Sequence, residues 1–315
     1  MKNIFRFFII SAVLIALCTA ANALTFDASC GTLQASAVSP GEPTSAAVLR
    51  FEDLPSGYFR CFTLRWYRDG VPVSGSQKVA VRKGACFVFR TSFCFSEDMP
   101  DTSTITAVLS SGHLQYSFDA KINIFNYDHA HYERLASLQY PYRIDVGRFQ
   151  NVVLIWAQDE NGEYSLLQNA FCCSTGKATP RGTFRSGTKL RWHLLYGSEE
   201  TDWQYVYGQY ITRITNSILF HSVPYYTQSR ADLESVQFNL LGTRASQGCI
   251  RLNAENAKWI YDHVPVGTEV NLIDTLELPC DVPVAPRLDL TDPRCTWDPT
   301  DQCARNPWLE GRRIG

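Results

Sequence analysis

Residues 25–127 alternate short apolar–polar runs with residues that favour turns, and this pattern restricts the segment to an all-β fold. The runs at residues 62–67 and 86–89 are typical of strands, because successive side chains of a strand point to opposite faces. Pro-Ser-Gly at residues 55–57 and Asp-Gly at residues 69–70 are turn signals between such runs. Repeated short strands with this punctuation predict a β-sandwich.

The stretch Trp-Tyr-Arg-Asp-Gly-Val-Pro-Val at residues 66–73 resembles a strand and hairpin of immunoglobulin-like domains. Cys61 and Trp66 are too close in the sequence for the cysteine–tryptophan spacing of antibody domains. We therefore expect only an Ig-like β-sandwich, over residues 24–127. Four cysteines of this segment allow two disulfides in three connectivities: Cys30, Cys61, Cys86 and Cys94.

The first 23 residues have the pattern of a secretory signal peptide. Lys2 and Arg6 precede an apolar run at residues 7–17, and Ala-Asn-Ala at residues 21–23 is a small-x-small cleavage pattern. We expect a protein that is secreted or held in the cell envelope, in the periplasm or the cell wall. The alternative is an uncleaved anchor, which would then be the protein's membrane contact.

The composition limits the class of protein. A chain of 315 residues is long enough for two domains, and 45% hydrophobic with 19% charged residues is typical of a globular protein. The net charge is −2 and no long basic run occurs, so we expect no nucleic-acid partner.

A polar segment at residues 128–140 is expected to be a linker. His129 and His131 form a His-x-His pair in it, and a solvated linker is favoured over a metal site because no third ligand is nearby. Residues 141–274 are expected to form a second unit. Residues 275–315, which contain cysteine, proline and aspartate, are expected to be an extension and not a domain.

One helix is predicted in the second unit, directly after the stretch Ala-Ser-Gln-Gly-Cys-Ile-Arg-Leu at residues 245–252. Asn253 is a plausible N-cap, apolar residues follow at helical spacing, and Pro265 ends the pattern.

Cys249, which lies in that stretch, is a packed thiol, half of a disulfide, or a nucleophile. A nucleophilic cysteine requires a base and donors for an oxyanion. Gly248 lets the backbone turn, so that the N–H groups of residues 248 and 249 can converge on an oxyanion. Of the six histidines, His221 suits the base best, because it ends an apolar strand that can hold the imidazole towards a facing loop. The other five lie in the first unit, in the linker, in an aromatic run or at a helix end: His113, His129, His131, His193 and His263.

Residues 142–274 resemble the catalytic domain of the L,D-transpeptidase family. That family carries a histidine followed by a small residue and, after a variable loop, Ser/Thr-His-Gly-Cys and an apolar residue. Residues 221–224 match the first part and residues 246–251 the second. Further pieces that resemble the family lie at residues 173–176, 179–184, 239, 241–242, 257–262 and 267–268.

The resemblance implies a β-sandwich or barrel with a short helix after the cysteine, and it implies roles for the matched residues. Cys249 would be the nucleophile and His221 its base, with the backbone carbonyl of Ser222 orienting the imidazole. The N–H groups of Gly248 and Cys249 would form the oxyanion hole.

The resemblance also places Ser246, Gln247, Arg251 and Asn239 among the substrate-binding residues. Arg251 would bind a substrate carboxylate, and the alternative is a structural ion pair. Gln247 replaces the family's usual second histidine, and glutamine does not titrate. The loop between His221 and Ser246 is longer than the family leads us to expect.

By resemblance, the protein is an L,D-transpeptidase that acts on peptidoglycan stem peptides without a metal or an organic cofactor. Cys249 would attack the carbonyl of the third residue, a diamino acid, and expel the terminal D-Ala. An amine of a neighbouring stem would accept the acyl group, and carbapenems would inhibit. Two alternatives stay open: an L,D-carboxypeptidase that uses water as acceptor, and a non-catalytic wall-binding protein that Gln247 has disabled.

Overall fold

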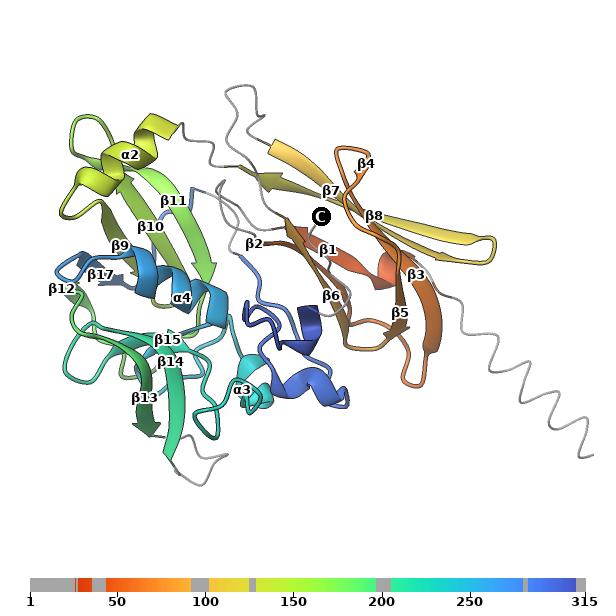
Figure 1. The fold of residues 1–315 in the computed structure, drawn as a ribbon. Coiled ribbons are helices and arrows are strands. Elements are labelled where there is room, and N and C mark those ends of the chain that lie inside the picture. The colour runs from red at the N-terminus through yellow and green to blue at the C-terminus, as the bar shows by residue number, and fades with distance from the viewer. Residues whose placement is uncertain are drawn as a thin grey trace, which may run out of the picture.

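The computed structural model describes residues 26, 28–35, 44–91, 102–124, 129–196, 205–279 and 283–309. The expected signal peptide at residues 1–23 lies outside them, as does Cys94. Within these ranges, no helix is long and apolar enough to cross a membrane. The fold is mostly β with several sheets, as predicted, and its strands gather in two units (Figure 1).

The N-terminal unit packs two antiparallel sheets around one core. One sheet has the order β1-β2-β6, and the other has the order β4-β3-β7-β8, with β5 paired to β3. Strand β7 alternates buried and more exposed residues along its length, so one face lies on the core. The elements are η1 (Ala28–Cys30), β1 (Thr32–Ala35), β2 (Thr44–Phe51), β3 (Phe59–Arg68), β4 (Val71–Pro72), β5 (Gln77–Arg82), β6 (Ala85–Thr91), β7 (Thr102–Ser111) and β8 (Leu114–Asn123).

Residues of both sheets, such as Leu49 on β2 and Leu109 on β7, share one hydrophobic cluster. Two packed sheets with a common core match the predicted sandwich, while the Ig-like relationship stays a prediction. Cys30, Cys61 and Cys86 are free thiols, so no disulfide joins any two of these three. Cys61 faces solvent on β3, and the sulfur of Cys86 accepts a hydrogen bond from the backbone N–H of Arg287.

The second unit also contains two sheets, with the orders β11-β10-β9-β17-β12 and β13-β14-β15-β16. Two of its strand pairs, β9–β17 and β15–β16, are parallel. The elements are α2 (His129–Ser137), β9 (Tyr142–Gly147), β10 (Val152–Gln158), β11 (Tyr164–Cys172), β12 (Gly182–Arg185), β13 (Lys189–Tyr196), β14 (Tyr205–Arg213), β15 (Leu219–Ser222), α3 (Ser235–Phe238), β16 (Ile250–Leu252), α4 (Ala254–His263) and β17 (Glu269–Ile273).

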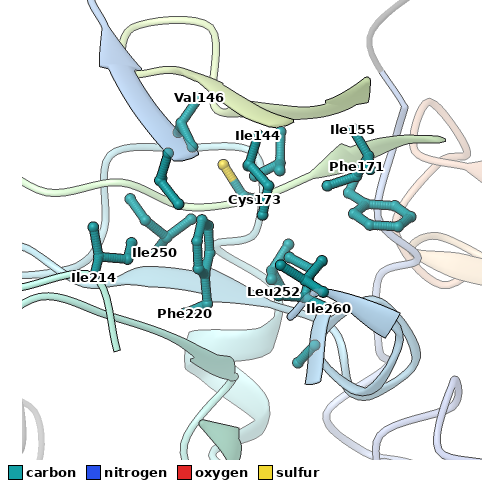
Figure 2. Packing of buried hydrophobic residues seen from close by; sticks show 14 of the residues in the cluster. Ile144, Val146, Ile155, Phe171, Cys173, Ile214, Phe220, Ile250, Leu252 and Ile260 are labelled. Atoms are coloured by element: carbon teal, nitrogen blue, oxygen red, sulfur yellow. The ribbon is translucent and has the colours of Figure 1, made fainter. Parts of the chain in front are cut away.

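The core of the second unit lies between these sheets. Ile144 on β9 and Ile155 on β10 belong to the same buried cluster as Phe220 on β15 and Ile250 on β16 (Figure 2). Because Phe220 and Ile250 point into this core, their neighbours along β15 and β16 point to the opposite face. The candidate catalytic residues lie on that opposite face.

The predicted helix after the cysteine is α4. The side chain of Asn253 accepts a hydrogen bond from the N–H of Asn256, which confirms it as the N-cap, and the helix ends just before Pro265. The carboxylate of Asp298, far along the chain, accepts a further bond from the N–H of Ala254 at 2.7 Å. The first turn of α4 is therefore capped both locally and by the C-terminal extension.

The expected linker at residues 128–140 is partly helical. Helix α2 buries Leu135 in the core of the second unit, and Arg134 donates hydrogen bonds to the carbonyls of Gln158 and Asp159. The prediction of a solvated linker is therefore wrong for this segment. One leucine and one arginine dock an otherwise polar helix, which explains why the composition resembled that of a linker.

The C-terminal extension contains η3 (Pro293–Thr296) and η4 (Pro307–Leu309) and lies between the two units (Figure 1). Arg82 of β5 pairs with Asp289 of the extension. Arg90 of β6 pairs with Glu255 of α4 at 3.4 Å and donates to the carbonyl of Pro299 at 3.2 Å. The extension thus contacts both units, while the domain boundaries proposed from the sequence stay a prediction.

Candidate active site

The parallel pairing of β15 with β16 brings the two predicted motifs together. His221 lies directly opposite Arg251, and Ser222 lies opposite Leu252. Cys249 is the residue just before β16, two positions from Arg251. This register places His221 beside Arg251 on adjacent strands, with Cys249 two positions before Arg251.

His221 is held in one tautomer. Its Nδ1 lies 2.6 Å from the backbone carbonyl oxygen of Ser222, and because a carbonyl only accepts, Nδ1 carries the hydrogen. Nε2 is then left with a free lone pair. Burial, followed by the positive charges of Arg251 and His193, lowers the pKa of His221 to about 3, against the opposing hydrogen bond to Ser222. The imidazole is therefore neutral near pH 7, which is the form that accepts a proton.

A glycine makes room for this imidazole. A Cβ built at Gly208 would lie 3.1 Å from Nδ1 of His221 and 2.9 Å from Cδ1 of Leu195. Tyr210, two residues on, has a φ of 54°, which interrupts the alternation of β14. Gly208 and Ile211 consequently face the same side, with 3.1 Å from that Cβ to Cδ1 of Ile211. A side chain at position 208 would push on the base.

His193 on β13 lies directly opposite Gly208 and so shares its face of the sheet. The four strands thus carry a row of His193, Gly208, His221 and Arg251. Sequence reasoning placed His193 in an aromatic run, where it would pack or form a hydrogen bond, and did not connect it with His221. The structure shows that it is an electrostatic neighbour of the candidate base.

Cys249 has a half-buried thiol. Its Sγ donates a weak bond to the carbonyl of Ser217 at 3.7 Å and accepts one from the backbone N–H of Leu219. Burial raises the pKa of Cys249, while the Leu219 bond and the positive charges of Arg251 and Arg213 oppose that rise. The resting group is therefore a thiol, which requires a base before it can attack.

The backbone before the cysteine is fixed by the segment at residues 176–179. The carbonyl of Gln247 accepts from the N–H of Ala178 at 2.8 Å, and the carbonyl of Gly248 accepts from Oγ1 of Thr179 at 2.8 Å. In a trans peptide unit the following N–H points the opposite way. The N–H groups of Gly248 and Cys249 therefore both point away from residues 176–179, and the oxyanion hole that they would form stays a prediction.

Two glycines permit this close approach. A Cβ at Gly248 would lie 2.9 Å from Cδ1 of Ile218, and a Cβ at Gly176 would lie 2.4 Å from the carbonyl oxygen of Ser246. The hydroxyl of Ser246 donates to the carbonyl of Cys249 at 2.6 Å, so this side chain holds the loop. Gln247 is exposed beside the cysteine.

Arg251 and Asn239 differ from their predicted roles. Arg251 is 6% exposed, and its guanidinium donates to the side-chain oxygen of Gln237 and to the carbonyl of Ala245. Asn239 donates to the carbonyl of Leu288 at 2.8 Å and accepts from its N–H at 2.6 Å. Both side chains are thus committed to protein partners, and Asn239 anchors the extension in place of the substrate role that the resemblance implied.

Sequence reasoning missed the contributions of Gly208, Thr179 and Arg213. A glycine inside the aromatic run at residues 205–210 was an available signal for close approach to another group. Thr179 lies in a stretch noted only for its resemblance to the family, and nothing local singles out Arg213. Within the described ranges, no three His, Cys, Asp or Glu side chains gather as metal ligands would.

Comparison with known proteins places this geometry in a family. Residues 141–272 match the family model of the L,D-transpeptidase catalytic domain, YkuD. YciB of Bacillus subtilis, which its name assigns provisionally to the L,D-transpeptidases, is 36% identical over 96 residues, 30% of this chain and 45% of YciB. ErfK/SrfK of Salmonella typhimurium, named a probable L,D-transpeptidase, is 59% identical over 34 residues, 11% of each chain. The chain thus spans less than half of these two curated relatives.

A solved structure with a similar chain is L,D-transpeptidase 3 of Mycobacterium tuberculosis, in complex with a faropenem-derived adduct. The identity is 17% and the TM-score 0.32, over 76% of this chain and 95% of that one. The family match covers both predicted motifs, at residues 221–224 and 246–251. Residues 141–272 are therefore identified with the L,D-transpeptidase catalytic domain, and the resemblance predicted from the sequence is confirmed.

Proposed function

We propose that the protein cross-links peptidoglycan stem peptides, with Cys249 as nucleophile and His221 as general base. The observation that carries the proposal is the 2.6 Å contact between Nδ1 of His221 and the carbonyl of Ser222. This contact leaves Nε2 as the proton acceptor, on the strand next to the one that Cys249 precedes. A tautomer held in this way is what a cysteine–histidine acyltransferase requires.

In the first half-reaction, Nε2 of His221 takes the thiol proton as Sγ of Cys249 attacks the carbonyl of the third stem residue. The oxyanion that forms would lie against the N–H groups of Gly248 and Cys249. When the tetrahedral intermediate collapses, the bond to the terminal D-Ala breaks, and its amine leaves with the proton from His221. The stem remains as a thioester on Cys249.

In the second half-reaction, the amine of a neighbouring stem attacks the thioester and gives a proton to His221. Sγ leaves as the thiolate and regains that proton. Water in place of the amine would give an L,D-carboxypeptidase from the same groups. The neutral resting pair, a buried imidazole with a lowered pKa and a thiol with a raised pKa, suits proton transfer at the moment of attack.

The proposal includes export to the cell envelope or beyond, which the charged start and apolar run of residues 1–23 support. The N-terminal unit would hold the enzyme at the wall or act as a spacer. Arg90 ties it to Glu255 at the first turn of α4, so we propose that it is fixed on the catalytic unit.

The test is intact-protein mass spectrometry with the carbapenem imipenem, followed by incubation with tetrapeptide stems and an acceptor amine. We expect one adduct on the native protein, none on Cys249→Ala, and an unchanged adduct on Cys61→Ala, which removes an exposed thiol of the other unit. Cross-linked dimers should form only with Cys249 present. An adduct that survives Cys249→Ala, or a native protein that stays unmodified, would favour the non-catalytic wall-binding protein.

A further inference from the structure

A short loop lies against the thiol of Cys249. We call residues 214–218, which join β14 to β15, the thiol loop. The carbonyl of Ser217 faces Sγ at 3.7 Å, and Leu219, directly after the loop, donates its N–H to the same sulfur. Ile218 packs against Gly248, with 2.9 Å from its Cδ1 to a Cβ built there. The position of this loop therefore determines what the sulfur meets.

The thiol loop is held internally by Thr215. Its Oγ1 accepts from the N–H of Ile218 at 3.0 Å and from that of Ser217 at 3.3 Å. The carbonyl of Ile218 accepts from the N–H of Ile214 at 2.8 Å and from that of Thr215 at 3.0 Å. These bonds shape the turn, but they do not attach it to the sheet.

Ile214 and Ile218 bury their side chains in the core of the second unit, and Arg213 adds a polar attachment of the loop. Nη1 of Arg213 donates to the carbonyl of Asn216 at 2.7 Å and to that of Thr215 at 3.5 Å. The backbone of Arg213 is fixed to the neighbouring segment at residues 187–188, because its N–H donates to the carbonyl of Thr188 at 3.1 Å and its carbonyl accepts from the N–H of Gly187 at 2.7 Å. The guanidinium of Arg213, at the fixed end of β14, thus holds the thiol loop by hydrogen bonds.

Arg213 also brings charge to the thiol. The charged groups that act on Cys249 are Arg251 and Arg213, and both favour the thiolate. His221 lies opposite Arg251 on the neighbouring strand. Arg251 is buried on the side of Gln237, whereas Arg213 is half-buried beside the loop. Two cations that approach from different strands reduce the penalty of placing a negative sulfur in a half-buried position.

We propose that Arg213 is a positioning residue for Cys249, which holds the thiol loop against Sγ and stabilises the thiolate by its charge. This inference rests on the proposed role of Cys249 as nucleophile. It gives Arg213 a role in the reactivity of the thiol and no role in binding the substrate. Its effect must therefore appear in the reactivity of the thiol itself, before any stem peptide is bound.

The experiment measures alkylation of Cys249 by neutral iodoacetamide in the full chain from pH 6 to pH 10.5, with the site located by peptide mass spectrometry. Arg213→Met removes the charge and the donors, and Arg213→Gln removes the charge but keeps a donor. We expect the midpoint to rise by about one pH unit in both, with alkylation at pH 7 about tenfold slower. Arg185→Met is the matched control, since Arg185 also donates to a backbone carbonyl, that of Gly267, and should leave the midpoint unchanged.

A midpoint in Arg213→Gln and Arg213→Met that equals the native one overturns the proposal. So does a variant in which alkylation is native but acylation by imipenem, which carries a carboxylate, falls, because Arg213 would then contact that carboxylate. If Arg213→Met fails to fold, Arg213→Gln decides alone. Failure of the proposed function gives a different result. If the alkylation midpoint of Cys249 depends on Arg213 but the native protein forms no cross-linked dimers, transpeptidation is refuted and this inference stands.

Discussion

Gly208 of β14 lies directly against the ring of His221, with 3.1 Å between a Cβ built at position 208 and Nδ1. This is shorter than ordinary van der Waals contact, and Cδ1 of Leu195 crowds the same position from the other side at 2.9 Å. The orientation of the candidate base therefore depends on the absence of a side chain one strand away.

Gly208→Ala should tilt the imidazole and slow acylation by imipenem about 10- to 100-fold, because small misplacements of a catalytic group cost that much. Gly75→Ala is the control, since a Cβ there meets nothing within 4 Å. The measurement is the acylation rate, with thermal unfolding to confirm the fold. Native kinetics in Gly208→Ala would show that the ring tolerates the methyl group.

Substitutions of His221 and of Gln247 should have very different effects on the acylation rate. His221→Ala removes general-base assistance and should slow acylation by at least about 10²-fold. Gln247 is exposed and contributes hydrogen bonding only, about 0.5–1.5 kcal/mol, so Gln247→Ala and Gln247→His should each change the rate by about tenfold at most. Equal losses in Gln247→Ala and His221→Ala would contradict this division of roles.

The stability of the fold should depend on pH through His221. Its pKa is about 3 when folded and 6.5 as a free group, so between these values the unfolded chain binds the extra proton. Stability should fall as pH falls through this window, by about 1.4 kcal/mol per pH unit at most. His221→Gln should lose this slope in urea unfolding at pH 7, 6 and 5.

Asp298 should change the stability of the fold with pH in the direction opposite to that of His221. Burial raises the pKa of its carboxyl to about 6 from 3.8, so the folded chain binds the extra proton and gains stability as pH falls from 6 to 3.8. The slopes are therefore compared between native, His221→Gln and Asp298→Asn proteins. If His221→Gln has the native slope, the imidazole is not buried in its neutral form.

Arg90→Met should loosen the N-terminal unit from the catalytic unit. It removes the pair with Glu255, whose side chain is 13% exposed against 6% for Arg90, and the bond to Pro299. We expect a loss of about 1.5–3 kcal/mol in calorimetry and an earlier first transition, with imipenem acylation unchanged. Arg65→Met, on the exposed face of β3, is the control. A simultaneous loss of acylation would show that the N-terminal unit shapes the site.

Much of the local structure followed from the sequence because its causes are local. Asn253 and Pro265 bound helix α4 by capping and by the missing N–H of proline. The alternation at residues 62–67 predicted a strand, and in β3 these residues alternate between buried and more exposed positions. Helix α2 was missed because its docking through Leu135 and Arg134 depends on partners at distant positions.

For the candidate site, the residue types in the two motifs were enough to predict the proposed chemistry, because a thiol, an imidazole and a glycine suit acyl transfer. Only the tertiary structure decided which groups surround them. The parallel register of β15 and β16 sets Arg251 beside His221, the kink at Tyr210 turns Gly208 towards the imidazole, and Arg213 reaches the thiol loop. Registers and kinks arise from the packing of whole sheets, so no short stretch of sequence encodes them.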